Sequence, residues 1–214
     1  VVLQNCHLAT HWLPSLTGVW EEVIAKPETH PEFRLWLTSY PCPAFPTSLL
    51  QAGVKVTIQR PMGVKPCLLS FYKSDYVTEG SMYREAGPTF HRLLFGLAFF
   101  HGVAEERRQY GPVGWNIPYE FSPSDLTVSA RQLHQLLADS SSPPWPALHY
   151  LTAQCNYGGR VTDDQDRRLT ASLLARSYNN QLVENPGLAL SPSGTYCVPL
   201  ELEVEAVQEA VQSL

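Results

Sequence analysis

The sequence predicts an α/β region followed by a mainly α-helical region. Over residues 1–65, short apolar runs typical of strands alternate with segments of helical periodicity, a pattern that favours a parallel sheet with crossover helices. From residue 66 onward the strand pattern nearly disappears and helical patterns dominate. The chain has 214 residues, 44% of them hydrophobic and 16% charged, which is enough to bury an ordered core.

Strands in the first region are expected at VVLQN (1–5), FRLWLT (33–38) and VKVTI (54–58). A helix with apolar positions from Trp12 to Ile24 separates the first two strands, and a short helix that ends at Gly53 precedes the third. Because a helix separates each strand from the next, the strands are predicted to run parallel in one sheet.

The second region is predicted to be a set of packed helices with ordered connections. Its dominant element is a helix over Thr89–Gln109, apolar almost all round and therefore buried, which Tyr110-Gly111-Pro112 brings to an end. The further expected elements, in chain order, are an aromatic-rich loop at 114–121, a helix that begins at Ser122, a linker at Ser140–Pro146, a short helix at Ala147–Ala153, a helix that ends near Tyr178 and a helical acidic segment at 200–214.

Composition argues against several classes of partner. A formal net charge of −5 leaves no basic surface for nucleic acid. The most apolar run, Leu93–Ala104, is interrupted by His101 and is shorter than the roughly 20 residues that a membrane span needs, so no membrane partner is expected. The five cysteines include no CxxC pair, which favours reduced thiols. Because the sequence opens inside a strand pattern, we expect a fragment of a longer protein.

An α/β region followed by a helical bundle is the layout of a P-loop ATPase core and its lid. In such a core, one strand ends in acidic residues that hold Mg²⁺ and polarise water. The first two predicted strands end instead in Gln4-Asn5 and Thr38-Ser39, and the sequence contains no GxxxxGK[ST] motif to wrap phosphates. We therefore predict a segment that does not hydrolyse ATP unaided.

The segment CNYGGRVTDDQDRR, residues 155–168, is the strongest candidate site. Three carboxylates, Asp163, Asp164 and Asp166, fall within four residues and could hold a divalent cation, so a small metal-dependent hydrolase using Asp163 and Asp166 is one alternative. Helix capping is the favoured interpretation. Thr162 or Asp163 would cap the first turn, acidic side chains complement the positive end of a helix, and no His or Glu nearby completes a coordination shell.

Other candidate residues carry weaker patterns. His7 and His11 are four apart, as in a zinc pair on a helix, but further converging ligands are missing. Trp115, Tyr119 and Phe121 are expected to dock the aromatic-rich loop onto the helices. Neither group predicts a catalytic centre.

Five long stretches carry a family resemblance: VLQNCHLATHWLPSL, FRLWLTSYPCPAFPTSLLQAGVKVT, RLLFGLAFFHGVAEERRQYGPVGWNIPYEFSPSDLTVS, YLTAQCNYGGRVTDDQDRR and LSPSGTY. In this order, over about residues 1–196, they resemble the C-terminal part of dynein heavy chains, in the style of the axonemal (ciliary) members.

The resemblance implies a three-part organisation. Residues 1–65 would be the second half of the large subdomain of the sixth AAA+ module, without a Walker A motif. Residues 66–178 would be the helical lid of that module, and 179–214 the start of the C-terminal region. The family does not use this module for hydrolysis, so the resemblance implies no cofactor for this segment and ATP with Mg²⁺ in other modules. It gives a structural role in the lid to the following motif residues: Asn156, Gly158, Gly159, Arg160, Thr162, Asp163, Asp164, Asp166 and Arg167.

The resemblance also implies partners and location. These are the neighbouring AAA+ modules and C-terminal region of the same heavy chain, the dynein intermediate and light chains, and microtubules contacted by the parent motor. The implied activity of the parent is ATP-driven, minus-end-directed movement, and the implied location is the cytoplasm, the cytoskeleton and the axoneme of cilia. A truncated, non-motor binding partner of dynein complexes is the second alternative.

Overall fold

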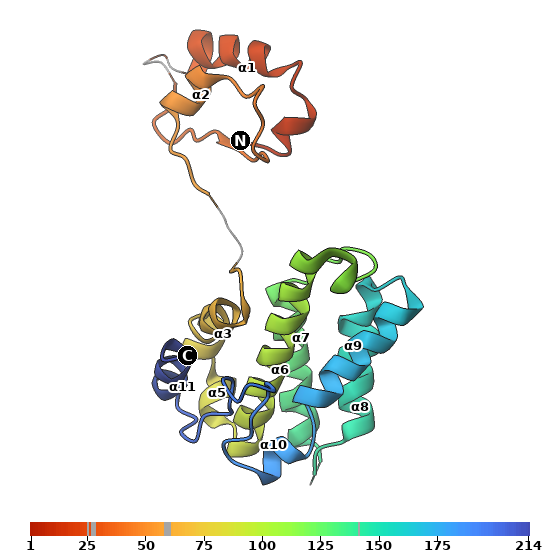
Figure 1. The fold of residues 1–214 in the computed structure, drawn as a ribbon. Coiled ribbons are helices and arrows are strands. Elements are labelled where there is room, and N and C mark those ends of the chain that lie inside the picture. Colours follow the sequence, from red (N-terminus) through yellow and green to blue (C-terminus); the bar gives the residue numbers. More distant parts are fainter. Residues whose placement is uncertain (25, 27–28, 58–60, 141) are drawn as a thin grey trace. The chain divides into compact units, whose positions relative to one another are not determined.

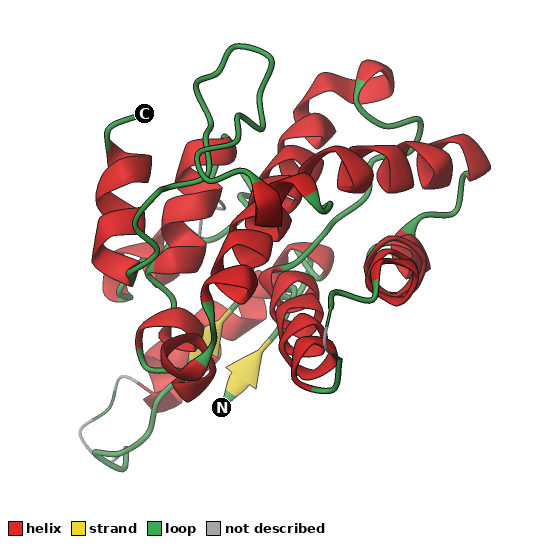
Figure 2. Ribbon diagram, turned by 90° about the horizontal axis from the view of Figure 1, so that it is seen from below, coloured by secondary structure: helices red, strands yellow, loops and turns green. Residues whose placement is uncertain are grey.

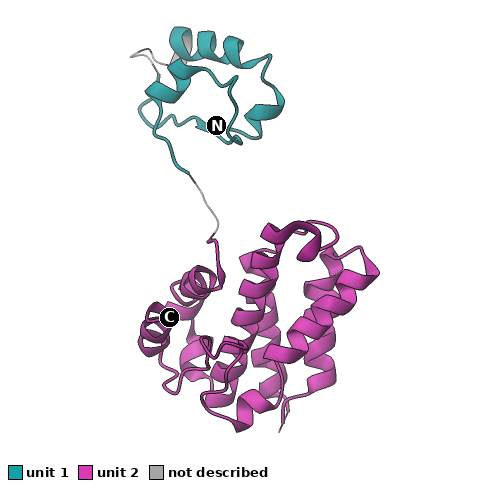
Figure 3. Ribbon diagram, in the orientation of Figure 1, with its two compact units in different colours: residues 1–59 teal, residues 60–214 magenta. Residues whose placement is uncertain are grey.

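A computed structural model describes the whole chain except residues 25, 27–28, 58–60 and 141. The chain divides into two compact units, Val1–Gln59 and Arg60–Leu214, which Figure 3 colours separately. Each unit has its own hydrophobic core.

The first unit is built on two short parallel strands. β1 (Val2–Leu3) pairs with β2 (Trp36–Leu37), with Val2 opposite Trp36. α1 (Leu13–Val19) and a π-helical turn (Trp20–Ile24) lie between them in sequence. The predicted parallel pair with a helical crossover is therefore confirmed for the first two strands.

The rest of this unit is a short helix and a small core. α2 (Thr47–Ala52) ends at Gly53, as the sequence predicts. Leu49 on this helix belongs to a core whose buried members are Cys6, Leu13, Leu16 and Leu49.

The third strand expected at 54–58 is wrong for its described residues. Val54–Thr57 adopt no regular structure, and the side chains of Val54 and Val56 are exposed to 95% and 74%. Ile58 lies outside the described residues. An alternating apolar pattern becomes a strand only when a neighbouring strand pairs with it. In the described residues the sheet consists of β1 and β2, and neither of them pairs with Val54–Thr57.

The second unit is almost entirely helical (Figures 1 and 2). Its α-helices are α3 (Val64–Tyr72), α4 (Asp75–Thr78), α5 (Ser81–Glu85), α6 (Pro88–Arg107), α7 (Pro123–Ala138), α8 (Trp145–His149), α9 (Asp164–Ser177), α10 (Gln181–Glu184) and α11 (Val204–Gln212). A π-helical turn (Tyr150–Asn156) extends α8, and 3-10 turns occupy Arg108–Val113 and Gly158–Arg160.

α6 is the centre of this unit. Most of its side chains from Leu93 to Ala104 are buried, and the helix packs against α3, α7, α9 and α10. The predicted central helix is thus confirmed, with its α-helical part ending at Arg107. A 3-10 turn follows, in which Gly111 takes the positive φ of 53° that favours glycine.

The C-terminal segment is part of the same packed body. Leu182, Val198, Val207 and Val211 are each no more than 1% exposed and belong to the core around α6. α11 lies beside α3 (Figure 1), and its Gln208 side chain donates to the Tyr72 carbonyl at 2.8 Å. Within the described residues, none of the helices combines the length and the hydropathy that crossing a bilayer demands.

Candidate functional site

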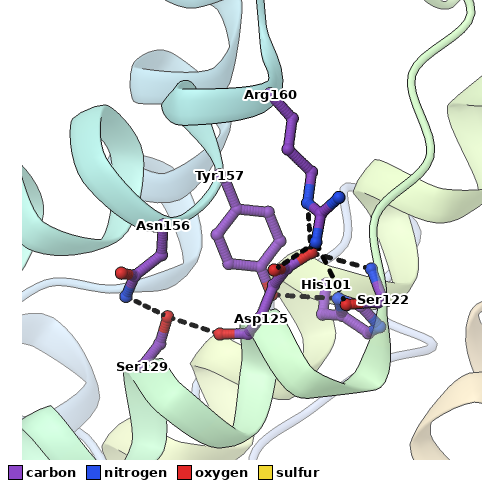
Figure 4. Close-up of polar contacts among 7 residues, drawn as sticks. All are labelled: His101, Ser122, Asp125, Ser129, Asn156, Tyr157 and Arg160. Atoms are coloured by element: carbon purple, nitrogen blue, oxygen red, sulfur yellow. Dashed lines mark hydrogen bonds and ion pairs between the residues drawn. The ribbon is translucent and has the colours of Figure 1, made fainter.

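The motif at 155–168 connects the π-helical turn after α8 to the start of α9. Its first half faces α6 and the N-terminal end of α7, where seven polar residues meet. We call this group the junction cluster (Figure 4); its members are His101, Ser122, Asp125, Ser129, Asn156, Tyr157 and Arg160.

Helix α7 begins with a reciprocal cap. Ser122 is the N-cap residue, and Asp125 returns a hydrogen bond by accepting from the Ser122 backbone N–H at 2.8 Å. Such a capping box satisfies two backbone donors at a helix start. Consequently the carboxylate of Asp125 is held in a defined orientation at the end of α7.

Arg160 binds that oriented carboxylate with two nitrogens. Its Nε donates to Oδ2 of Asp125 at 2.9 Å, and its Nη2 donates to Oδ1 at 3.0 Å. The hydrogen bond to Asp125, and then its negative charge, raise the pKa of the Arg160 guanidinium. The Arg160 side chain is 47% exposed, so water weakens this pair, although its two-pronged geometry is the favourable one.

A buried pair lies next to the ion pair. The Tyr157 hydroxyl and Nδ1 of His101 on α6 are 2.9 Å apart, and the Tyr157 side chain is fully buried. Burial lowers the pKa of His101 to about 4 and raises the pKa of Tyr157 far above its usual range. Both side chains are therefore neutral at pH 7, and their hydrogen bond joins the motif to α6.

Asn156 makes the third connection. Its amide nitrogen donates to the Ser129 hydroxyl and to Oε1 of Gln132, both on α7 and both at 2.8 Å. Ser129 in turn donates to the Asp125 carbonyl at 2.8 Å. The turn at 156–160 is thus attached by side chains to two helices, α6 and α7.

The second half of the motif starts α9. Asp163 is the N-cap residue, and its Oδ1 accepts from the backbone N–H groups of Gln165 and Asp166, both at 2.9 Å. The hydrogen bond from the Asp166 N–H has the largest effect and lowers the pKa of Asp163. The hydrogen bonds from the Asn116 side chain and the Gln165 N–H act in the same direction. The sequence allowed Thr162 or Asp163 as the N-cap of this helix. In the structure the N-cap is Asp163, and Thr162 is exposed.

Asp166 serves as an anchor for the loop after α6. Its side chain is 3% exposed and accepts from the backbone N–H groups of Asn116, at 3.0 Å, and Ile117, at 3.3 Å. The same loop is held by Trp115, whose indole N–H donates to the Ala104 carbonyl, and by Tyr119, whose hydroxyl accepts from the Asp163 N–H. Trp115, Tyr119 and Phe121 are all buried, which confirms their expected docking role.

The remaining motif residues divide into close-packed and exposed positions. A Cβ atom at Gly158 would lie 2.3 Å from the Ala153 carbonyl oxygen, whereas one at Gly159 would meet nothing within 4 Å. Asp164 is exposed, and its Oδ1 lies 4.0 Å from Arg167, whose Nη2 donates to the Val161 carbonyl. Only Gly158 is thus required by packing.

The arrangement gives no support to metal chemistry. In the described residues, no three His, Cys, Asp or Glu side chains are placed to share a metal ion. Asp163 and Asp166 direct their carboxylates at backbone N–H groups, and Asp164 points elsewhere into solvent. Nδ1 of His7 accepts from the Tyr40 backbone N–H. His7 therefore holds a loop in place.

Sequence reasoning missed the residues outside the motif that form hydrogen bonds with it. Asp125 could have been found, because Ser122 followed three positions later by an acidic residue is a capping-box pattern. His101, Asn116 and Ser129 carry no such signal. They come from other helices and loops, and only the fold brings them to the motif.

Comparison with known proteins gives two family matches. Residues 90–214 match the family described as "Dynein heavy chain AAA lid domain", and residues 1–57 match "Dynein heavy chain region D6 P-loop domain". The lid match alone covers more than half of the chain.

Similar curated proteins come from animals and an alga. Dynein axonemal heavy chain 3 of Mus musculus is 49% identical over 201 residues, which is 93% of this chain and 5% of the mouse protein. Dynein axonemal heavy chain 12 of Homo sapiens is 45% identical over 217 residues, all of this chain and 7% of the human protein. Dynein-1-beta heavy chain, flagellar inner arm I1 complex, of Chlamydomonas reinhardtii is 42% identical over 215 residues, all of this chain and 5% of the algal protein. The chain therefore spans only a small part of the length of these relatives.

Proposed function

Since the chain belongs to the dynein heavy chain family, in its D6 P-loop and AAA lid regions, we propose that it is a mechanical segment of the motor ring that does not itself hydrolyse ATP. In this role the segment transmits movements between neighbouring AAA+ modules. The parent heavy chain would be the ATP-hydrolysing, minus-end-directed microtubule motor, with ATP and Mg²⁺ bound in other modules.

The junction cluster is the observation that carries this proposal. Arg160, Tyr157 and Asn156 attach one turn to α6 and α7, and Asp166 attaches the start of α9 to the loop after α6. A lid whose helices are joined by such side-chain bonds moves as one body, because a displacement of one helix breaks buried bonds in the others. Rigid-body movement is what a relay in a ring requires.

The first unit supports a non-hydrolysing role. After β1 the chain turns at Asn5, which has a positive φ of 56°, and the Asn5 N–H donates to the Thr38 hydroxyl after β2 at 3.1 Å. The Cys6 N–H donates to the Thr38 carbonyl at 2.9 Å. The groups at these strand ends are thus amides and hydroxyls that bind each other, where hydrolysis would need a carboxylate.

Partners and location follow from the family. We propose contacts with adjacent AAA+ modules and the C-terminal region of the same heavy chain, and an assembly that includes intermediate and light chains and reaches microtubules. The names of the relatives, which are axonemal and flagellar, support a place in the axoneme of cilia. Neither alternative, the small hydrolase or the truncated non-motor partner, has support in the site or in the relatives.

The boundaries of the three parts are also proposals. Residues 1–65 are assigned to the large subdomain, 66–178 to the lid and 179–214 to the start of the C-terminal region. The burial of Leu182 and Val207 in the core around α6 supports a last part that moves together with the lid.

Calorimetry with the 214-residue chain tests the non-hydrolysing role. ATP and ADP, each with Mg²⁺, are titrated into the chain, and the expected result is no binding heat up to millimolar nucleotide. Saturable binding of ATP, or phosphate release above a buffer blank, would contradict the proposal.

Gliding assays test the mechanical role. In a heavy chain that contains this segment, Arg160→Glu should slow microtubule gliding while leaving ATP binding in the other modules intact, because it sets a second carboxylate against Asp125. Asp164→Asn, at an exposed motif position, is the matched control. Unchanged gliding in the Arg160→Glu motor would remove the junction cluster from the relay.

A further inference from the structure

A second candidate site lies in the helical unit, at a mostly apolar cavity that none of the junction cluster lines. A cavity of about 170 Å³ opens between α6, α9 and the turn at 190–192. Phe99, Phe100 and Leu173 supply apolar walls, and Arg176 and Ser191 are among the polar residues at its lining. A cationic and a hydroxyl side chain, from the end of α9 and from the turn at 190–192, therefore border one small space.

Arg176 is available as a cation. It lies in the last turn of α9 and is exposed. The ion pairs formed among described residues use Arg108, Arg160 and Arg167, and no Asp or Glu in that part of the chain forms one with Arg176. An anion introduced at the cavity would meet an uncompensated guanidinium.

Ser191 begins a tight surface turn. Its carbonyl accepts from the Gly194 N–H at 3.0 Å, and Gly194 has the positive φ of 72° that closes the turn. The Ser191 hydroxyl accepts from the Tyr196 N–H at 3.1 Å, and Pro192 and Ser193 are exposed. The Ser191 hydroxyl also pairs with the Ser193 hydroxyl at 3.1 Å, and the Leu190 N–H donates to the Tyr196 carbonyl at 2.7 Å. A kinase therefore reaches this serine by local opening of a surface turn, which costs less than global unfolding.

We propose that Ser191 is a phosphorylation site for a protein kinase that selects serine followed by proline, and that Arg176 receives the phosphate. The kinase would use ATP as the phosphoryl donor. The Ser191 Oγ attacks the γ-phosphorus, the new O–P bond forms as the bond to the β-phosphate oxygen breaks, and ADP leaves. The hydroxyl proton passes to a carboxylate of the kinase.

The product suits the cavity chemically. A phosphoserine carries a charge of about −1.5 to −2 and three acceptor oxygens, for which arginine is the preferred partner. A phosphate on Ser191 would tie the turn before α11 to the end of α9. The modification would thereby change how firmly residues 188–198 are held to the lid.

Two other Ser-Pro pairs make the proposal specific. Ser122-Pro123 is committed to the cap of α7, and Ser142-Pro143, whose serine is exposed, precedes α8. Neither borders this cavity. A phosphate on Ser142 is therefore a control that has the same sequence preference without an arginine receptor.

The test uses the full 214-residue chain with phosphoserine incorporated at position 191 or, as the control, at position 142. Phosphoserine at 191 should raise the Tm of the helical unit by roughly 2–4 °C, the change expected for one new charge-assisted contact in a domain of this size. Phosphoserine at 142 should not raise it. The gain at 191 should disappear in Arg176→Gln, whereas Arg168→Gln should preserve it. An equal gain with and without Arg176 would overturn the assignment of the receptor.

Access is tested by the enzyme reaction. A purified proline-directed kinase with ATP should phosphorylate Ser191 in the folded chain, measured by mass spectrometry, and Pro192→Ala should reduce the yield at least tenfold. If the kinase modifies Ser142 while Ser191 stays unmodified, Ser191 is not a site in the folded protein. Binding of nucleotide by the chain plays no part in this test, so its result is independent of the proposed motor role.

Discussion

Arg160 and Asp125 lie 35 positions apart in the chain, yet two hydrogen bonds of 2.9 and 3.0 Å join them at the start of α7. Asp125 accepts these bonds while it also caps the helix to which it belongs. One carboxylate therefore couples the beginning of a helix to the turn that leads into another.

Alanine substitutions measure this coupling. Arg160→Ala should lower the free energy of unfolding by about 0.5–1 kcal/mol, because a partly exposed pair is weak. Asp125→Ala should cost about 1–2 kcal/mol, since the cap is lost as well. Urea unfolding of both variants and of the double variant should give a positive coupling energy; strictly additive losses would show that the two residues do not interact in solution.

Asp166 should matter far more than Asp164, although both lie in the first turn of α9. Asp166→Ala leaves the N–H groups of Asn116 and Ile117 without their acceptor and should cost about 2–3 kcal/mol. Asp164→Ala, at an exposed position, should stay within about 0.5 kcal/mol of the original chain. Chemical denaturation separates the two cases. Comparable losses, or stabilisation of the chain by added Mg²⁺ that vanishes in both variants, would revive the metal interpretation.

The adjacent glycines provide a matched pair. Gly158→Ala should cost about 1–3 kcal/mol, because the new methyl group would collide with the Ala153 carbonyl. Gly159→Ala should be neutral or slightly stabilising, since its Cβ meets open space and the unfolded chain loses freedom. Thermal melts suffice for the comparison, and equal effects at the two positions would contradict the packing described for this turn.

Acid should destabilise the helical unit through His101. The pKa of His101 falls from 6.5 to about 4 on folding, because burial disfavours the charged imidazole. Between these values the unfolded chain binds the proton and the folded chain does not. Stability therefore falls as the pH drops from 6.5 to 4, by roughly 3 kcal/mol for this group.

His101→Gln isolates that contribution, because glutamine cannot titrate and can still bond to Tyr157. The free energy of unfolding of this variant, measured from pH 7 to pH 4, should change less steeply than that of the original chain. His134→Gln, which replaces a ring in contact with Phe90, is the control in the same unit. Identical slopes for the His101 variant and the original chain would mean that His101 is not buried neutral.

Removal of residues 180–214 should prevent the helical unit from folding cooperatively. This segment contributes Leu182, Val198, Val207 and Val211 to the core, and a fully buried aliphatic side chain is worth about 1.5–3 kcal/mol. The shortened chain should lose its near-UV circular dichroism and its sharp melt. A cooperative melt in the shortened chain would show that the C-terminal segment is a separate body.

Local patterns predicted the long helices well and one strand badly. They named neither α4 nor α5, and the linker expected at Ser140–Pro146 contains the start of α8. The all-round apolar character of α6 and the stop signals at Gly53 and Gly111 were sufficient to place two elements, α2 and α6, because burial and helix ends depend on residues close in sequence. The alternation at 54–58 is equally clear, yet Val54–Thr57 form no strand. Strand formation depends on a partner elsewhere, which no local pattern specifies.

The motif at 155–168 divides in the same way. The cap at Asp163 follows from the preference of helix starts for acidic residues, and it depends on the N–H groups of the next two or three residues. By contrast, nothing in the motif distinguishes Asp166 from Asp164, or Gly158 from Gly159. Asp166 is buried against the loop at Asn116 and Gly158 against the turn that contains Ala153, whereas Asp164 and Gly159 are exposed.

The sequence by itself determined the helical lid, the parallel crossover of the first unit and, through long family-specific stretches, membership of the dynein heavy chains. Only the tertiary structure decided that Asp125 binds Arg160 and that His101 forms a hydrogen bond with Tyr157. It also decided that Asp166 holds the loop after α6. The physical reason is range. Propensity and capping act over a few residues along the chain, whereas hydrogen bonds between helices exist only after burial of the core has brought those helices together.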